Sequence, residues 1–267
     1  MTDMATWRST IMTNMIQKTL VSLSACALML AGAGSWASEN IPSHIQAAVD
    51  SVDRPQTDRE RDATRKPAKV LAFAGIKPGQ TVIDVFSGDG YYTELLSRTV
   101  GAQGKVLAHN NQAYLGFVGD ELKTRFADHR LSNVEQILSE ANNLNLGNEV
   151  ADAVVLVLGF HDIYYVADYW PAVDEERFLA DIHRALKPGG ALLVVDHHAT
   201  PGSSTASGNS VHRIDPAHVT ATLNKAGFKL ERKAEFLENP DDDLSISVFE
   251  PAVKGKTSRF VHLYRRR

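Results

Sequence analysis

The chain contains a single cysteine, Cys26, among its 267 residues. This residue lies in an N-terminal apolar stretch that we expect to be removed from the mature protein. Without it the remaining domain has no thiol. Disulfides, thiolate nucleophiles and cysteine-ligated zinc are therefore excluded from the mature domain.

The chain also has little excess charge of either sign. The chain has 28 Lys and Arg against 32 Asp and Glu, a formal net charge of −4, and the two signs are interspersed. A nucleic-acid-binding surface normally shows as a basic block or as a basic stripe with aromatic residues. Neither pattern occurs, so we expect no nucleic-acid partner. The basic C-terminus, Arg265 to Arg267, is interpreted as a solvated tail.

A long hydrophobic run is missing as well. The apolar stretch from Thr19 to Gly34 is too short, and too rich in Ser, Ala and Gly, for a membrane span. It ends in Ser35-Trp36-Ala37, which places small residues at the two positions that a signal peptidase reads. We predict that residues 1–37 are a secretory signal peptide cleaved after Ala37. The mature chain would be periplasmic or secreted, with no stable membrane span; an uncleaved anchor or a buried helix is the alternative.

Cys26 gives the same segment another interpretation. Leu23-Ser24-Ala25-Cys26 resembles a bacterial lipoprotein box, in which the cysteine is lipidated after cleavage. A lipoprotein normally turns polar after this cysteine, whereas residues 27–31 here are apolar. Lipid anchoring at Cys26 stays an alternative to cleavage after Ala37.

Beyond residue 37, helical and strand patterns alternate. Residues 38–66 are polar and predict a leader helix followed by a loop, and residues 67–267 are expected to form the main domain. Helices are expected at 67–74, 91–100, 113–126, 175–187 and 216–227. Strands are expected at 81–86, 105–109, 134–138, 153–158, 191–195, 228–234 and 260–264. This alternation predicts an α/β domain in which helices cover both faces of a parallel sheet.

The turn after the first strand is a candidate ligand site. The strand passes through Asp84 into Phe86-Ser87-Gly88-Asp89-Gly90 and then directly into a helix. In an open α/β sheet, ligands bind outside the carboxyl ends of the strands. Gly88 and Gly90 let the backbone bend and a ligand approach, and the helix start offers free N–H groups. A plain tight turn would explain the two glycines equally simply.

The motifs together point to a family. Residues 84–90 resemble the Asp-x-Gly-x-Gly-x-Gly loop of class I S-adenosylmethionine-dependent methyltransferases, and Leu186-Lys187-Pro188-Gly189-Gly190 is similar to a later motif of that family. Residues 54–264 look closer still to an uncharacterised bacterial group of exported predicted methyltransferases. Shared with that group are Arg65-Lys66-Pro67, residues 90–96, His161-Asp162, His212 to Asp215 and Gly255-Lys256-Thr257.

The resemblance implies a Rossmann-like sheet of seven mostly parallel strands, with the last strand antiparallel. It also implies S-adenosylmethionine as cofactor and transfer of a methyl group to a small-molecule substrate. The acceptor and the oligomeric state are left open.

Carried over by position, the resemblance implies a cofactor site. Asp84, Gly88 and Gly90 would line the methionine and ribose. Asn110 stands where the family usually has an acid for the ribose hydroxyls, and Glu140 matches an acid that contacts the adenine amino group. Phe160 would lie near the sulfonium. The sequence departs from the family pattern at Phe86, which replaces the loop's first glycine, and at Asn110, which replaces a carboxylate.

Histidines follow several of the predicted strands. His161-Asp162, Asp196-His197-His198 and His212 fall at or just past strand carboxyl ends, so the fold would bring them to one rim. A histidine beside a carboxylate suits proton transfer near neutral pH, and we take His161, Asp162 and His212 as candidate catalytic residues. Structural capping by each histidine is an alternative. A zinc or manganese site is another, but the spacing matches no metal signature and no metal is predicted.

Two functions stay open at this point. One is a methyltransferase acting on a small-molecule acceptor. The other is a non-catalytic exported binding module that keeps the fold, which Phe86 and Asn110 would suit. A Rossmann dehydrogenase is disfavoured because the Gly-x-Gly-x-x-Gly spacing is missing. Binding of S-adenosylmethionine would separate the first two functions.

Overall fold

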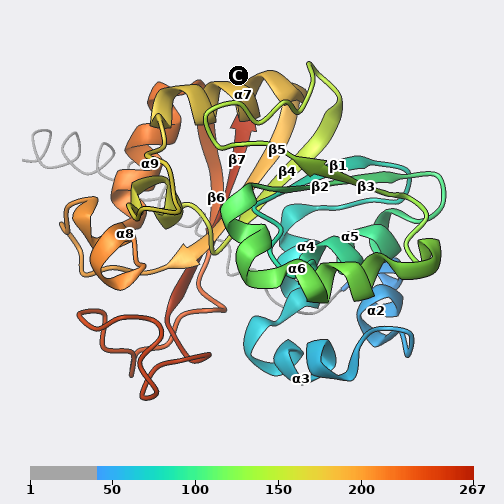
Figure 1. The fold of residues 1–267 in the computed structure, drawn as a ribbon, viewed down its shortest axis with the longest axis horizontal. Helices are drawn as coiled ribbons and strands as arrows, with labels where there is room; N and C mark the ends of the chain where they lie inside the picture. Colours follow the sequence, from blue (N-terminus) through green and yellow to red (C-terminus); the bar gives the residue numbers. More distant parts are fainter. Residues whose placement is uncertain (1–40) are drawn as a thin grey trace, which may run out of the picture. The chain divides into compact units, whose positions relative to one another are not determined.

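A seven-stranded sheet lies at the centre of residues 41–267, the part of the chain that the computed structural model describes (Figure 1). Its order is β3-β2-β1-β4-β5-β7-β6. The strands are β1 Thr81–Val85, β2 Lys105–Asn110, β3 Val134–Leu138, β4 Ala151–Val157, β5 Leu186–His197, β6 Phe228–Ala234 and β7 Arg259–Arg266. β7 pairs antiparallel with β5 and β6, and the other pairings are parallel. The predicted Rossmann-like fold with an antiparallel last strand is confirmed.

Helices connect these strands. They are α2 Ser43–Asp50, α3 Gln56–Arg65, α4 Pro67–Ala74, α5 Tyr91–Val100, α6 Gln112–Phe126, α7 Glu175–Ala185, α8 Ala206–Val211 and α9 Pro216–Lys225, with short 3₁₀ helices η1 Ala127–His129 and η2 His161–Tyr164. Among residues 41–267 no helix is long and apolar enough to cross a membrane. The predicted signal peptide, its cleavage site after Ala37 and Cys26 all lie outside the described residues.

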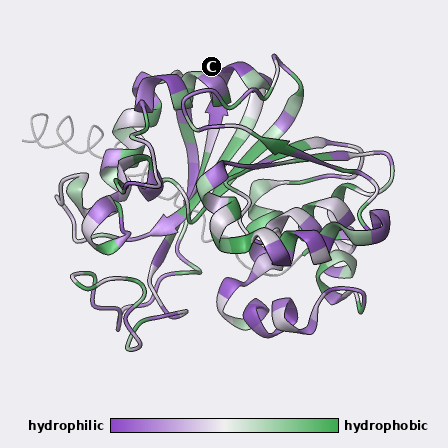
Figure 2. Cartoon of the chain, in the orientation of Figure 1, coloured by the Kyte–Doolittle hydropathy of each residue, from purple (hydrophilic) through white to green (hydrophobic). Residues whose placement is uncertain are grey.

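Each face of the sheet buries its own hydrophobic cluster, because successive side chains of a strand point to opposite faces. In β1, Val82 packs with residues of α2, α4 and α5, whereas Ile83 and Val85 pack with residues of α7 and α9. Figure 2 shows green, hydrophobic colour along the central strands and mostly purple colour on α3. Full burial of one such side chain stabilises the fold by about 1.5–3 kcal/mol.

Several helix ends lie where local chemistry predicts them. Pro67 occupies the first position of α4, and Gly75 ends that helix in the left-handed conformation with φ 71°. Asp174 caps α7 by accepting a hydrogen bond from the backbone N–H of Arg177, and Asp215 caps α9 in the same way. These residues set where the strand-to-helix connections begin and end.

Three sequence predictions are wrong in detail. The helix expected to continue to residue 187 ends at Ala185, because Leu186 is extended and pairs with Ala151 of β4. The side chain of Leu186 is buried in this strand position, as it would have been in a last helical turn. The leader segment forms two helices, α2 and α3, in place of one helix and a loop. The basic C-terminus is not a solvated tail: Arg265 lies in β7 and pairs with Glu231.

One glycine sets the distance between α8 and the 3₁₀ turn η2. A Cβ at Gly208 would lie 2.7 Å from the backbone oxygen of His161 and 3.1 Å from Cβ of Tyr164. We predict that Gly208→Ala lowers the free energy of unfolding by about 1–3 kcal/mol, the usual cost of overpacking. Gly119→Ala in α6 is the matched control, since a Cβ there meets no atom within 4 Å. Urea unfolding should show the control at or above wild-type stability; equal stability of the two variants would contradict the tight contact.

Candidate functional site

The loop after β1 leaves space at Gly88. Gly88 has φ 58°, in the left-handed region, and a Cβ there would meet no atom within 4 Å. Gly90 also has a positive φ, 79°, but a Cβ there would lie 2.6 Å from Cδ of Arg125. A ligand can therefore approach the backbone at Gly88, whereas the backbone at Gly90 is covered by an arginine side chain.

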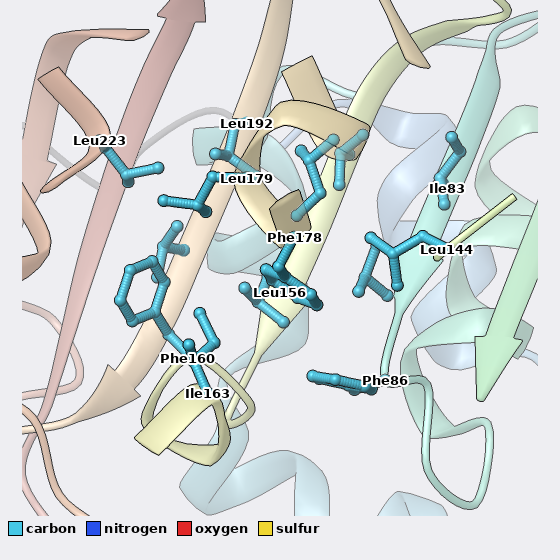
Figure 3. Packing of buried hydrophobic residues seen from close by; sticks show 14 of the residues in the cluster. Ile83, Phe86, Leu144, Leu156, Phe160, Ile163, Phe178, Leu179, Leu192 and Leu223 are labelled. Carbon is cyan, nitrogen blue, oxygen red and sulfur yellow. The ribbon is translucent and has the colours of Figure 1, made fainter. Parts of the chain in front are cut away.

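Phe86, which stands where the family has a glycine, packs inward. Its ring is 4 % exposed and stacks on the rings of Tyr114 and Phe178, with centroids 5.2 and 5.3 Å away. Figure 3 shows Phe86 at the lower end of the cluster formed with Phe178 and Leu156. The added bulk thus enlarges the hydrophobic cluster. The backbone accommodates it with φ 54°, a conformation that favours glycine.

Asn110 fastens the loop to the end of β2. Its Oδ1 accepts a hydrogen bond from the N–H of Gly88 at 2.9 Å, and its Nδ2 donates one to the carbonyl of Gly88 at 3.1 Å. The amide would have to turn away from Gly88 to reach a ribose, so its predicted ribose contact stays a prediction. Glu140 lies beside a hollow of about 460 Å³ at the start of α6, where it accepts a hydrogen bond from the N–H of Gln112 at 3.3 Å.

Asp84 is buried beneath the loop. Burial raises the pKa of its carboxyl, the charge of Asp89 adds to the effect, and a hydrogen bond from Thr93 at 2.6 Å opposes it, which leaves the pKa at about 7. Near neutral pH this carboxyl is therefore partly protonated. Its predicted role beside the methionine of the cofactor stays a prediction.

The histidine rim is assembled as predicted from three segments. The ring Nδ1 of His161, in η2 after β4, lies 2.8 Å from Oδ1 of Asp196 in β5. Its Nε2 lies 3.3 Å from Oδ1 of Asp162, whose Oδ2 accepts a hydrogen bond from the hydroxyl of Tyr114 at 2.6 Å. His212, in the left-handed position after α8, places Nδ1 3.9 Å from the same Oδ1 of Asp162.

The charges around His161 compensate one another. Burial alone lowers the pKa of its imidazole, but the carboxylates of Asp196 and Asp162 outweigh burial and raise the pKa to about 9. Burial raises the pKa of Asp162, and the nearby His161, His212 and Tyr114 more than offset this, so that its pKa is lowered. The carboxylates of Asp196 and Asp162 therefore stabilise a positive charge at His161.

His161, Asp162 and His212 line a pocket of about 520 Å³ whose walls are largely aromatic. Its lining is Tyr114, Phe117, Val118, Leu158, His161, Asp162, Tyr165, Tyr169, Trp170, His197, His212, Val248 and Phe249. The sequence analysis did not single out Tyr114, Phe117, Val118, Leu158, Val248 and Phe249. The position of Tyr114 in the first turn after β2 was the available signal for that residue. Phe160, a predicted cofactor contact, is fully buried and packs beside Ile163 (Figure 3).

The buried carboxyl of Asp84 predicts a pH dependence of stability. Because its pKa is raised in the folded protein, the native state keeps a proton that the unfolded state releases between pH 3.8 and about 7. Its contribution to the free energy of unfolding therefore falls as pH rises through this range, by up to about 1.4 kcal/mol per pH unit. Asp84→Asn should remove this slope.

Urea unfolding at several pH values measures this effect. Asp120→Asn is the control, because the side chain of Asp120 is exposed on α6. The control should keep the wild-type pH slope. A wild-type slope retained in Asp84→Asn would show that another group causes it.

A family model and curated relatives match this chain. The model described as the ubiE/COQ5 methyltransferase family matches residues 61–206. The ubiquinone/menaquinone biosynthesis C-methyltransferase UbiE of Escherichia coli O1:K1 / APEC is 32% identical over 124 residues, which cover 46% of this chain and 45% of that protein. The same enzyme of Shigella boydii serotype 18 matches with the same values. The chain thus matches less than half the length of these relatives.

Solved structures share the fold. An S-adenosylmethionine-dependent methyltransferase from Aquifex aeolicus aligns with a TM-score of 0.56 and 24% identity, covering 79% of this chain and 98% of that one. One from Mesorhizobium loti aligns with a TM-score of 0.53 and 17% identity, covering 77% and 100%. At these identities the likeness supports the sheet topology described above.

Proposed function

Because the chain belongs to the ubiE/COQ5 methyltransferase family, we propose that it transfers a methyl group to a small aromatic acceptor. S-adenosylmethionine is the cofactor that the family and the fold indicate. One observation carries the proposal: Tyr114 both stacks on Phe86 of the loop after β1 and lines the aromatic pocket. The cofactor loop and the candidate acceptor pocket therefore share a wall.

The loop has room and free polar groups for the cofactor. The space above Gly88 is open, and among the described residues Ser87 Oγ and His109 Nδ1 are buried atoms without a hydrogen-bond partner. Buried polar atoms of this kind normally find a partner, which a bound ligand can supply. Asp84, Gly88 and Glu140 would hold it there. Gly90 would contact it only after the covering side chain of Arg125 moves.

The bound cofactor supplies an electrophilic methyl group. The transfer then requires an aligned acceptor and a place for the acceptor's proton. Tyr165, Tyr169 and Trp170 offer flat faces against which an aromatic ring can stack. His161 is held in one orientation by Asp196, and its Nε2 is turned toward Asp162.

His212 is the proposed proton acceptor. Its ring is partly exposed, lies in the pocket wall and has Asp162 beside it. An acceptor hydroxyl bound between His161 and His212 would give its proton to the rim as the methyl group arrives. His161, Asp162 and His212 thus remain the proposed catalytic residues.

Cofactor binding tests the loop. We predict that Gly88→Val abolishes binding of S-adenosylmethionine, because a branched side chain would fill the open space above the backbone. Gly79→Val is the matched control: Gly79 also has a positive φ of 81° and no atom within 4 Å of a Cβ, but it lies in the turn before β1. Both variants therefore have similar backbone strain.

Calorimetric titration of the purified chain measures the affinity, and thermal unfolding checks the fold. The control should bind like wild type. Equal binding by Gly88→Val would place the cofactor elsewhere, and no binding by wild type would favour the non-catalytic binding module.

Export is proposed from the N-terminal sequence. The resemblance to an exported group of methyltransferases and the Ser35-Trp36-Ala37 ending support cleavage after Ala37, with the mature chain in the periplasm or secreted. We predict that intact-mass measurement of the periplasmic fraction or the culture medium finds a chain beginning at Ser38. A chain beginning at Cys26 with added acyl mass would establish lipid anchoring, and an uncleaved chain would contradict export by this signal.

A further inference from the structure

Three ligand-type atoms converge at the base of the aromatic pocket. They belong to His161, Asp162 and His212, and each lies within 4.8 Å of the others. Nε2 of His161 is 3.3 Å, and Nδ1 of His212 is 3.9 Å, from the same Oδ1 of Asp162. Hydrogen bonds in proteins normally join such atoms at about 2.7–3.2 Å. The three atoms are therefore close without being in good direct hydrogen bonds.

This spacing suits a shared metal ion. Zinc binds imidazole nitrogen and carboxylate oxygen at about 2.0–2.2 Å in tetrahedral geometry, which separates two ligand atoms by about 3.4 Å. The pair formed by His161 and Asp162 already has this separation, and the 3.9 Å between His212 and Asp162 would shorten by about half an ångström. The two imidazole nitrogens, which lie within 4.8 Å of each other, would also have to approach to about 3.4 Å. The partly exposed ring of His212 allows such a movement.

The other polar atoms of two of these residues are held by a buried carboxylate, Asp196, and by a half-buried hydroxyl, Tyr114. Nδ1 of His161 lies 2.8 Å from the carboxylate of Asp196. Oδ2 of Asp162, the oxygen that faces away from His161 Nε2, accepts a hydrogen bond from the hydroxyl of Tyr114 at 2.6 Å. A histidine that donates its Nδ1–H to a carboxylate presents the lone pair of Nε2. In metal sites, that arrangement fixes the ring and makes the ligand nitrogen more basic.

Electrostatics favour a cation at the same point. In the neutral form of His161 set by Asp196, the Nε2 lone pair faces the carboxylate of Asp162, which is repulsive unless a positive charge lies between them. The carboxylates of Asp196 and Asp162 lie 2.8 and 3.3 Å from the two ring nitrogens of His161, and both would attract a metal ion. A proton on Nε2 is the competing occupant.

We propose that Nε2 of His161, Oδ1 of Asp162 and Nδ1 of His212 bind a divalent cation of the zinc class. Imidazole and carboxylate ligands suit zinc among the divalent metals. Three protein ligands leave a coordination position open toward the pocket, as in catalytic zinc sites. The ion would lower the pKa of an acceptor hydroxyl bound there. With the ion bound, His212 would act as its ligand in place of the proton acceptor, and the hydroxyl proton would pass to water. Only this last role depends on the proposed methyl transfer.

Zinc binding is measured on the full chain after treatment with a chelator and dialysis, with neither cofactor nor acceptor present. Calorimetric titration with Zn²⁺ should show one site per chain. His212→Ala should weaken binding by at least about tenfold, and Asp196→Asn by about 10–100-fold through the orientation of His161. His218→Ala is the matched control, because His218 contacts Tyr164 outside the cluster.

The visible absorption of bound Co²⁺ is a second measurement, and it reports the metal's ligands separately from the stability of the fold. The absorption should show tetrahedral nitrogen and oxygen ligation in wild type and in His218→Ala, and lose this signature in His212→Ala. Thermal unfolding without metal checks that His212→Ala is folded. Absence of stoichiometric binding, or equal affinity in wild type and His212→Ala, would overturn the metal site. Metal binding without any methyl transfer would keep the site and remove the proposed function.

Discussion

The buried carboxylate of Asp196 holds the turn after β4 against the end of β5, and the candidate site depends on it. Its Oδ2 accepts the backbone N–H of His161 at 2.9 Å, and its Oδ1 lies 2.8 Å from Nδ1 of the same residue. β4 and β5 are parallel neighbours, so their carboxyl ends meet at one edge. Loss of this carboxylate would leave a buried imidazole and N–H unpaired, which costs about 1–3 kcal/mol for each group.

The two sides of the site are joined through α6. Tyr114, in the first turn of this helix, donates to Asp162 on the histidine rim and stacks on Phe86 of the loop after β1. Asn110 fixes the same loop to β2. The side chain of Tyr114 is therefore shared by the loop after β1 and the aromatic pocket, and its packing on Phe86 helps to set the spacing between them.

Local signals predicted most of the fold. Pro67 and Gly75 bound α4, and the β-branched run of β1 reads clearly as a strand, because each signal acts within a few residues. Leu186 was misassigned because an apolar residue after a helix suits either a last helical turn or a first strand residue. The proximity of His161 and His212 could be predicted, because both follow strands whose carboxyl ends lie at the same edge of the sheet. The contact of Tyr114 with Asp162 could not be predicted, since it depends on side-chain packing between segments 48 residues apart.

A crystal structure of the full chain with S-adenosylhomocysteine would show whether the cofactor lies between the loop after β1 and the aromatic pocket. We expect the adenosyl group over Gly88, with the sulfur directed toward the pocket that contains His161 and His212. The hydrogen bonds between Asp196 and His161 should be the same in that structure, because the carboxylate of Asp196 is fully buried. A ligand bound away from the loop after β1, or a sulfur directed away from the aromatic pocket, would contradict this placement.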